Sequence, residues 1–211
     1  MFPEIEMLSA FLLASIGLTL LPGPDNLFVI SQSILHGSRT GIATALGMAA
    51  GNFVHTLAVA IGLSALIMAT PALFSLIRAL GVSYLLYLAW QSWHHPMQIS
   101  SPHESPDTPQ LSTLQLFKRG ALMNILNPKV ALFFLAFFPQ FIDMSSDHKA
   151  LQIFLLGSLF VLQSGLIFSG IALMAGRLQT LMMKVPPRWL AGITAGLFVL
   201  LSTYLAMSAI R

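Results

Sequence analysis

The sequence contains no cysteine and very few charged residues. None of its 211 residues is a cysteine, so a disulfide framework and a cysteine-ligated metal site are both excluded. Only 8% of the residues are charged, against roughly 25% in soluble domains. Hydrophobic residues make up 56% of the chain, and its mean hydropathy is +0.81. This composition predicts an all-α polytopic protein of a lipid bilayer.

Signals of enzymes and of nucleic-acid binding are also missing. The ten lysines and arginines are spread along the chain, so we expect no nucleic-acid surface. No Gly-x-Ser-x-Gly, His-Glu-x-x-His or phosphate-loop motif is present, so we expect neither an enzyme nor a cofactor. Uphill transport would therefore draw on an ion gradient. His94, His95 and His103 lie in a polar loop without acidic or cysteine partners at a fixed spacing, so no metal site is predicted.

Six apolar stretches are long enough to span a bilayer, which needs about 20 residues for each helix. They cover about 5–35, 42–69, 71–93, 116–142, 150–176 and 189–210. The polar loop 94–117 divides a single transport domain, 1–211, into a first repeat of about 5–93 and a second of about 118–211. The first six residues lack the positive charge of a signal peptide, so we expect the first span to be retained.

The connections between the spans predict their orientation. The polar turn 36–41, the loop 94–118 and the basic connector 177–188 lie on one side and carry most of the lysines and arginines. The positive-inside rule makes that side cytoplasmic and places both termini in the periplasm. Tyr84, Tyr87, Trp90 and Trp93 end the third span, as expected of an aromatic belt at the membrane interface.

A break interrupts the first span at Pro22, Gly23 and Pro24, directly before Asp25 and Asn26. Proline removes a backbone donor and clashes with the preceding turn, so the helix must stop there. An aspartate at membrane depth adds about 2.5–3.5 kcal/mol on insertion scales. Such a feature is tolerated where it lines a cavity or where the acid has a partner.

The fourth span contains a second break, at Asn127, Pro128 and Lys129, just after Asn124. Asparagine before proline is a helix cap followed by a favoured first helical residue. At about 1.5 Å per residue, both breaks lie roughly 22 Å from the same side. Paired breaks in two three-helix halves are typical of inverted repeats around a transport site.

Aligning Pro24 with Pro128 places Asp25 opposite Lys129. The half-helix N-termini at the two breaks would attract a carboxylate, and the two charges would complement a zwitterion. The alternative interpretation is a structural ion pair that only joins the two breaks.

The second span carries polar residues on one helical face, at Gly51, Asn52 and His55. They line a cavity, or His55 is a hydrogen-bonded core histidine. His55 and Asp25 are both candidates for relaying a proton. The spacings Gly47–Gly51 and Gly192–Gly196 favour close helix packing over a dimer seam.

Several segments together resemble the LysE/RhtB family of amino-acid exporters. These are 21–26 (LPGPDN), 38–42 (SRTGI), 45–52 (ALGMAAGN), 84–90 (YLLYLAW), 124–134 (NILNPKVALFF) and 138–142 (FPQFI). The resemblance implies a multi-pass inner-membrane exporter of an amino acid or derivative, proton-coupled, with six helices in two inverted repeats, and it admits a homodimer. Its motifs map onto both breaks.

The predicted site for substrate binding or coupling lies between the broken first and fourth spans. Its candidate residues are Pro22, Gly23, Pro24, Asp25, Asn26, Asn52, His55, Asn124, Asn127, Pro128 and Lys129. Lys129 and the break backbones would hold the carboxylate, and Asp25, Asn26 and Asn124 the amino end or the opposing break. Other classes stay open: a channel, an intramembrane enzyme, or a non-transporting membrane assembly factor.

Overall fold

A computed structural model describes residues 5–67, 71–96, 111–143 and 146–207, and all regular structure within them is helical. The first half contains α1 (Ile5–Leu20), α2 (Pro24–His36), α3 (Ser38–Ile67) and α4 (Pro71–His94). The second half contains α5 (Thr113–Ile125), α6 (Pro128–Leu132), α7 (Lys149–Leu173), α8 (Ala175–Lys184) and α9 (Pro187–Met207). The predicted all-α class is confirmed.

Both predicted breaks are present. α1 and α2 meet at an angle of 58°, and α5 meets the segment that begins with α6 at 50°. Among the described residues, α3, α7 and α9 are each long and apolar enough to cross a membrane, and the number rises to at most five if each bent pair is one span. α4, at the predicted third span, is not among them, so six spans in two inverted repeats stay a prediction.

The segment after the second break departs from ideal helix geometry. α6 has only five α-helical residues, and the chain continues as a π-helix over Phe133–Phe137 (η1) and a 3-10 helix over Phe138–Phe141 (η2). A half-helix begins at Pro128, as predicted, with Asn127 as its cap, and the attraction of an anion to its N-terminus stays a prediction.

Two connections differ from the sequence prediction. The polar turn expected at 36–41 shrinks to Gly37, whose φ of 88° favours glycine, and α3 already begins at Ser38. The connector expected at 177–188 is largely helical, as α8. Its basic residues Arg177 and Lys184 are exposed, so the segment keeps its polar surface while its backbone donors are satisfied internally.

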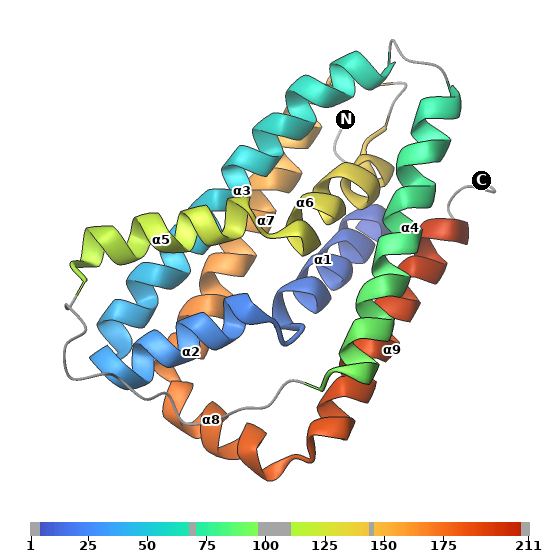
Figure 1. Cartoon of the computed structure of the whole chain (residues 1–211). Helices are drawn as coiled ribbons and strands as arrows, with labels where there is room; N and C mark the ends of the chain where they lie inside the picture. The colour runs from blue at the N-terminus through green and yellow to red at the C-terminus, as the bar shows by residue number, and fades with distance from the viewer. Residues whose placement is uncertain (1–4, 68–70, 97–110, 144–145, 208–211) are drawn as a thin grey trace.

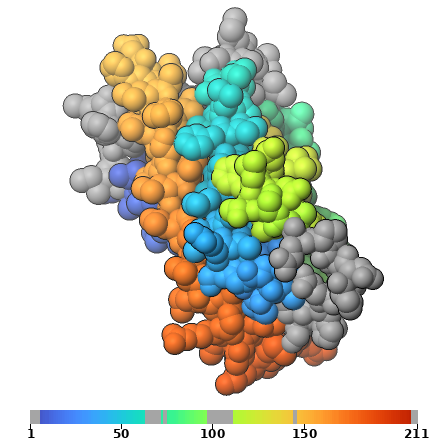
Figure 2. Space-filling view, turned by 90° about the vertical axis from the view of Figure 1, so that its left-hand side faces the viewer, coloured from blue at the N-terminus to red at the C-terminus, as the bar shows by residue number. Residues whose placement is uncertain are grey.

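The helices pack as two groups. α3 lies against α2, α5 and α7, whereas α4 pairs with α9 and touches the other group chiefly through η1. Figure 1 shows α4 and α9 side by side, with α8 at the end opposite the start of α4. Figure 2 shows α3 between α7 and α5 on one face. The two groups diverge toward α8, and this divergence positions the site.

Small residues and aromatic rings hold these contacts. A Cβ added at Gly47 would collide with the Phe117 carbonyl of α5, so the predicted packing role of Gly47 and Gly51 is confirmed. The same prediction is wrong for Gly196, which has no atom within 4 Å of an added Cβ. Where α1, η1, η2 and α7 meet, seven phenylalanines form a buried cluster: Phe11, Phe133, Phe134, Phe137, Phe138, Phe141 and Phe160.

Candidate functional site

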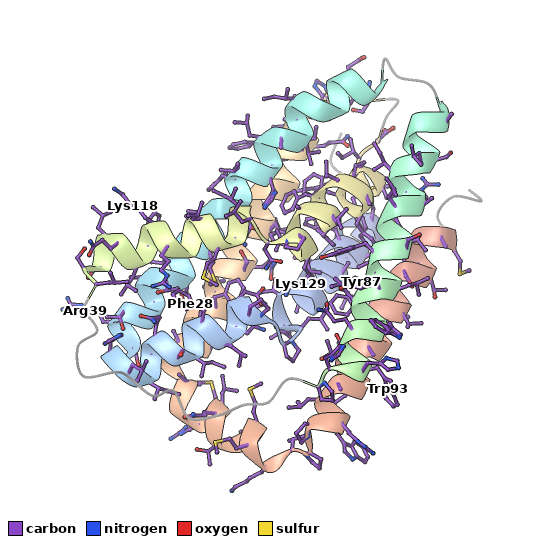
Figure 3. All side chains as sticks on the ribbon, in the orientation of Figure 1. Phe28, Arg39, Tyr87, Trp93, Lys118 and Lys129 are labelled. Atoms are coloured by element: carbon purple, nitrogen blue, oxygen red, sulfur yellow. The ribbon has the colours of Figure 1, made fainter. Side chains whose placement is uncertain are left out.

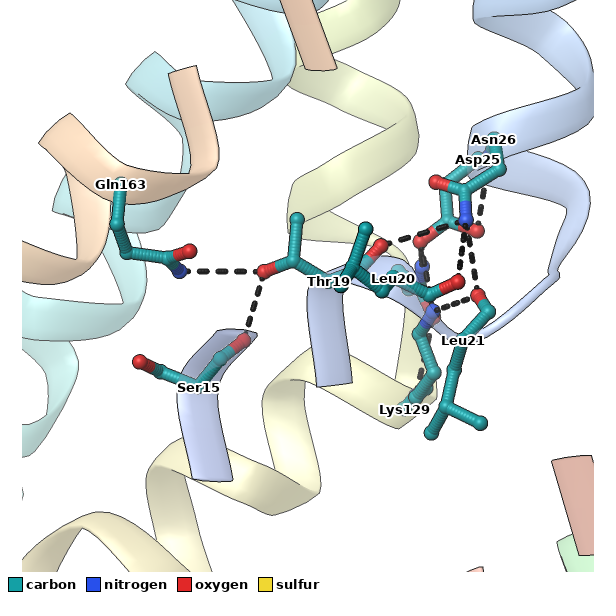
Figure 4. A network of polar contacts seen from close by, with 9 residues as sticks. Ser15, Thr19, Leu20, Leu21, Asp25, Asn26, Lys129 and Gln163 are labelled. Atoms are coloured by element: carbon teal, nitrogen blue, oxygen red, sulfur yellow. Dashed lines mark hydrogen bonds and ion pairs between the residues drawn. The ribbon is translucent and has the colours of Figure 1, made fainter. Parts of the chain in front are cut away.

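The first break satisfies its own backbone through Asn26. α1 ends at Leu20, which leaves carbonyls without an intrahelical donor. The side-chain amide of Asn26 donates to the carbonyls of Thr19, Leu20 and Leu21, at 3.3, 3.4 and 3.0 Å. Figure 4 shows these bonds converging on one nitrogen. The nitrogen of Asn26 thus holds its own break together, while its side-chain oxygen has no hydrogen-bond partner among the described residues, and its role as a ligand of the amino end stays a prediction.

Asp25 and Lys129 form an ion pair that joins the two breaks. The Lys129 Nζ lies 2.8 Å from Asp25 Oδ2, and their side chains are only 9% and 6% exposed. Asp25 Oδ1 accepts from the backbone N–H of Asn26 at 3.0 Å, and Oδ2 also accepts from Asn127 Nδ2 at 3.4 Å. The charges predicted to lie opposite each other in the repeat are therefore in contact (Figure 4).

Local chemistry fixes both partners. Asp25 lies in the first turn of α2, where a negative charge is favoured. Asn127 caps α6 by accepting from the Lys129 N–H at 3.0 Å, as predicted. Gly23 has an extended backbone (φ −158°), so its role is spatial: an added Cβ would collide with Asp25 Oδ1.

A cavity of about 460 Å³ lies between the breaks and the α4–α9 pair, within the range of about 300–1,000 Å³ usual for ligand sites. One wall comes from the predicted residues Pro22, Gly23, Pro24, Asn127, Pro128 and Lys129. The other wall comes from Tyr84, Tyr87, Leu88, Gln91 and Ser92 of α4 and from His95 just after it, from Met182 of α8, and from Leu190, Ala191, Thr194 and Phe198 of α9. Figure 3 labels Lys129 and Tyr87 on the two walls.

The α4–α9 wall is the part of the site that sequence reasoning missed. Tyr84 and Tyr87, expected in an interfacial belt, also line the cavity. Tyr87 is 48% exposed, close to the 53% of Trp90 and the 60% of Trp93, so its exposure still fits a belt. The spacing of positions 84, 87, 88, 91 and 95 marks one helical face and was the available signal. Hydropathy alone could not say which way that face points.

A second, much smaller cavity of about 10 Å³ lies behind the ion pair; we call it the polar chamber. Its polar lining is Thr19, Asp25, Asn52, Asn124, Lys129 and Ser164. Lys129 lines both cavities and thus separates them. The predicted residues Asp25, Asn52 and Asn124 therefore face the chamber instead of the large cavity.

His55 lies apart from both cavities. Its Nε2 lies 3.2 Å from the carbonyl oxygen of Asn124, and its ring stacks on Phe134 with centroids 5.4 Å apart. It is not among the lining residues of either cavity. These contacts match the hydrogen-bonded core histidine, and a titrating role stays a prediction.

The described part of the chain contains no cluster of potential metal ligands. No group of three or more histidine or acidic side chains there could hold a metal ion. The His94 ring contacts the Trp90 carbonyl at 2.9 Å. His103 lies outside the described residues.

Comparison with known proteins gives a consistent family. A model of the family described as LysE type translocator matches residues 16–209. A leucine efflux protein of Enterobacter sp. (strain 638) is 35% identical over 178 residues, covering 81% of this chain and 83% of the relative. One of Salmonella typhimurium is 33% identical over 177 residues, covering 81% and 82%. No solved structure matches the chain significantly.

The matched region spans both breaks, both cavities and the α4–α9 wall. The spanning helices and the bacterial relatives make the chain a multi-pass protein of the inner membrane. The ion-paired breaks thus lie in a transporter and not in an enzyme: this chain belongs to the LysE type translocator family.

Proposed function

We propose that this protein exports an amino acid with an apolar side chain, leucine or one of similar shape, in exchange for protons. The observation that carries the proposal is a buried cation, Lys129, in the wall of a large cavity between two broken helices. Broken helices in a membrane are tolerated where they line a cavity, and paired ones mark transport sites. The relatives named leucine efflux proteins support the choice of cargo.

The cavity divides by chemistry into parts that suit such a cargo. Among the described residues that line the cavity, Lys129 is the only lysine or arginine, so it binds the carboxylate. Leu88, Ala191 and Phe198 on the opposite wall provide apolar surface for the side chain. The cargo thereby inserts between Lys129 and Asp25, with its ammonium group replacing Lys129 at the carboxylate of Asp25.

Exchange follows from competition at Asp25. A proton and the cargo ammonium neutralise the same carboxylate, so each excludes the other. If the carrier moves its site from one side of the membrane to the other only when Asp25 is neutralised, it exports one cargo molecule for each proton that enters. The ion pair with Lys129 also satisfies this buried acid, so obligatory exchange requires that the carrier does not change its exposed side while this pair is intact.

The proposed topology places α8 on the cytoplasmic side and both termini in the periplasm. Arg39 and Lys118 are exposed (Figure 3), as are the basic residues of α8. The cavity reaches His95, near the end of α4, and Met182 of α8, so it lies toward this side. The phenylalanine cluster closes the path on the other side.

Inside-out membrane vesicles containing the full chain test the proposal. With an acidified interior, they should accumulate leucine above its external concentration, and lysine and glutamate serve as contrasting cargoes. Lys129→Gln should weaken leucine uptake about 10- to 100-fold, the effect of losing one charged hydrogen bond. Lys118→Gln, an exposed lysine on α5, is the matched control.

Two results would overturn the proposal. If no amino acid in a panel of apolar and polar cargoes accumulates, the export function is wrong. If leucine only equilibrates and never exceeds the external concentration, the protein is a channel.

A further inference from the structure

The polar chamber contains acceptors that the ion pair does not use. Asn52 and Asn124 are 0% and 3% exposed, and both line the chamber. The side-chain oxygen of each has no hydrogen-bond partner among the described residues. Buried polar atoms in native proteins are almost always paired, so two orphaned acceptors beside one carboxylate indicate a missing donor.

Hydrogen bonds fix the orientation of Asn52. Its Nδ2 donates to Ser164 Oγ at 3.0 Å, and the Ser164 hydroxyl donates its only hydrogen to the Val161 carbonyl at 3.1 Å. Ser164 can therefore only accept from Asn52, which leaves the Asn52 oxygen as the unused group. The Asn124 oxygen lies against Gly51, 2.8 Å from where a Cβ there would stand.

We propose that the polar chamber is the receptor for the primary ammonium group of the cargo, with Asn52 and Asn124 as its selecting residues. This inference rests on the proposed function and adds which end of the cargo is recognised, and by what. A primary ammonium has three N–H donors. The residues that line the chamber carry three acceptor groups for them: the Asp25 carboxylate and the two orphaned amide oxygens.

The size of the chamber sets its selectivity. Its volume of about 10 Å³ accommodates one small polar group. A methyl or acetyl substituent on the cargo nitrogen would remove a donor and add atoms that have no space. The chamber therefore accepts free α-amino acids and rejects their N-substituted derivatives.

Lys129 shows how the chamber is reached. Its ammonium already lies at the edge of the chamber, 2.8 Å from Asp25, while its side chain also lines the large cavity. When Lys129 turns to the cargo carboxylate, it leaves this position open. Because the ammonium and carboxylate of an α-amino acid share one carbon, the cargo can reach both partners at once.

Binding measurements on the purified full-length protein test the inference. The probes are L-leucine, N-methyl-L-leucine and N-acetyl-L-leucine, and the variants are Asn52→Leu and Asn124→Leu. The wild type should prefer leucine to both derivatives at least tenfold. Each variant should bind leucine about 10- to 100-fold more weakly, as expected for one charged hydrogen bond, with binding of N-acetyl-leucine unchanged.

Gln140→Leu is the matched control. Gln140 in η2 also has a partly buried amide with an orphaned oxygen, but it lines neither cavity. It should leave the preference for leucine over its derivatives unchanged. The ratio of affinities is informative even where a variant lowers the folded fraction, because all probes are measured on the same sample.

The outcomes separate the two proposals. If the wild type binds leucine but the asparagine variants still prefer leucine to its N-substituted derivatives as strongly as the wild type does, the proposed ammonium receptor is overturned and the export proposal stands. Equal losses for leucine and N-acetyl-leucine would likewise overturn it, because they indicate a structural role. If the wild type binds no amino acid, both proposals fall.

Discussion

At the scale of single residues, the ion pair between Asp25 and Lys129 connects the two breaks through one short contact. Each partner is almost fully buried, and Asn26 and Asn127 add hydrogen bonds to the same carboxylate. A buried pair of this kind gives little net stability over an apolar pair, yet removing one partner leaves an uncompensated charge. Because removing both charges costs little stability and removing one costs much, a variant without both charges can show whether the pair is needed for transport as well as for stability.

We expect Lys129→Met to destabilise the protein by about 3–5 kcal/mol, because Asp25 would stay buried without its partner. The double variant Asp25→Asn with Lys129→Met should recover most of this stability, since no charge remains unpaired. It should still fail to transport. Thermal unfolding in detergent and leucine uptake by inside-out vesicles measure the two effects. Uptake at the wild-type rate by the double variant would show that the pair is only structural.

At the scale of elements, the α4–α9 pair is a unit that touches the rest of the molecule mainly at η1. The contact is close: a Cβ at Gly81 of α4 would lie 2.5 Å from the Cβ of Ala136. Beyond Gly81, α4 diverges from the breaks and bounds the large cavity. We expect the α4–α9 pair to move relative to the breaks about this tight contact, because its other end borders a cavity.

The substitution Gly81→Ala tests this contact against Gly196→Ala in α9. Alanine at Gly81 must displace η1, and such overpacking destabilises by about 1–3 kcal/mol; we expect slower transport as well. Alanine at Gly196 has no neighbour within 4 Å, and its higher helix propensity should stabilise by up to about 1 kcal/mol. Unfolding temperatures that change in the same direction for both variants would contradict this interpretation.

The sequence predicted the elements whose causes are local, and missed those that depend on packing. Proline chemistry located the breaks near Pro22 and Pro128, and aligning the two breaks as repeats placed Lys129 opposite Asp25. The face of α4 that carries Tyr87 and Gln91 could not be oriented, because an apolar span in a bilayer has no hydrophilic side to mark the exterior. The π-helix over Phe133–Phe137 has no local signal, since its phenylalanines suit an α-helix equally well.

At the scale of the whole molecule, the arrangement agrees with two related halves. α3 packs against α7, and α4 packs against α9, so helices at corresponding positions of the two halves are neighbours. Each half also has its bent pair near the centre, α1 with α2 and α5 with α6. An inverted repeat of six spans fits this arrangement, and its direct test is the side of the membrane on which each connection lies.

Single cysteines can report this topology, because the chain has none of its own. Thr180→Cys places a thiol on the exposed surface of α8, and Asp147→Cys places one in the exposed connection before α7. A membrane-impermeant maleimide added to intact spheroplasts should label position 147 and leave position 180 unlabelled. The reverse pattern would invert the proposed orientation, and labelling of both positions would contradict the single crossing of the membrane by α7 between them.

Lys129 has one further consequence, which concerns the carrier without cargo. The lysine is a tethered amine that occupies the place proposed for the travelling one, and it lies in the partition between the two cavities. An idle molecule therefore keeps Asp25 satisfied and the partition filled. Under the proposed exchange, this internal stand-in guards against leak, because a proton binds Asp25 only when the lysine has left it.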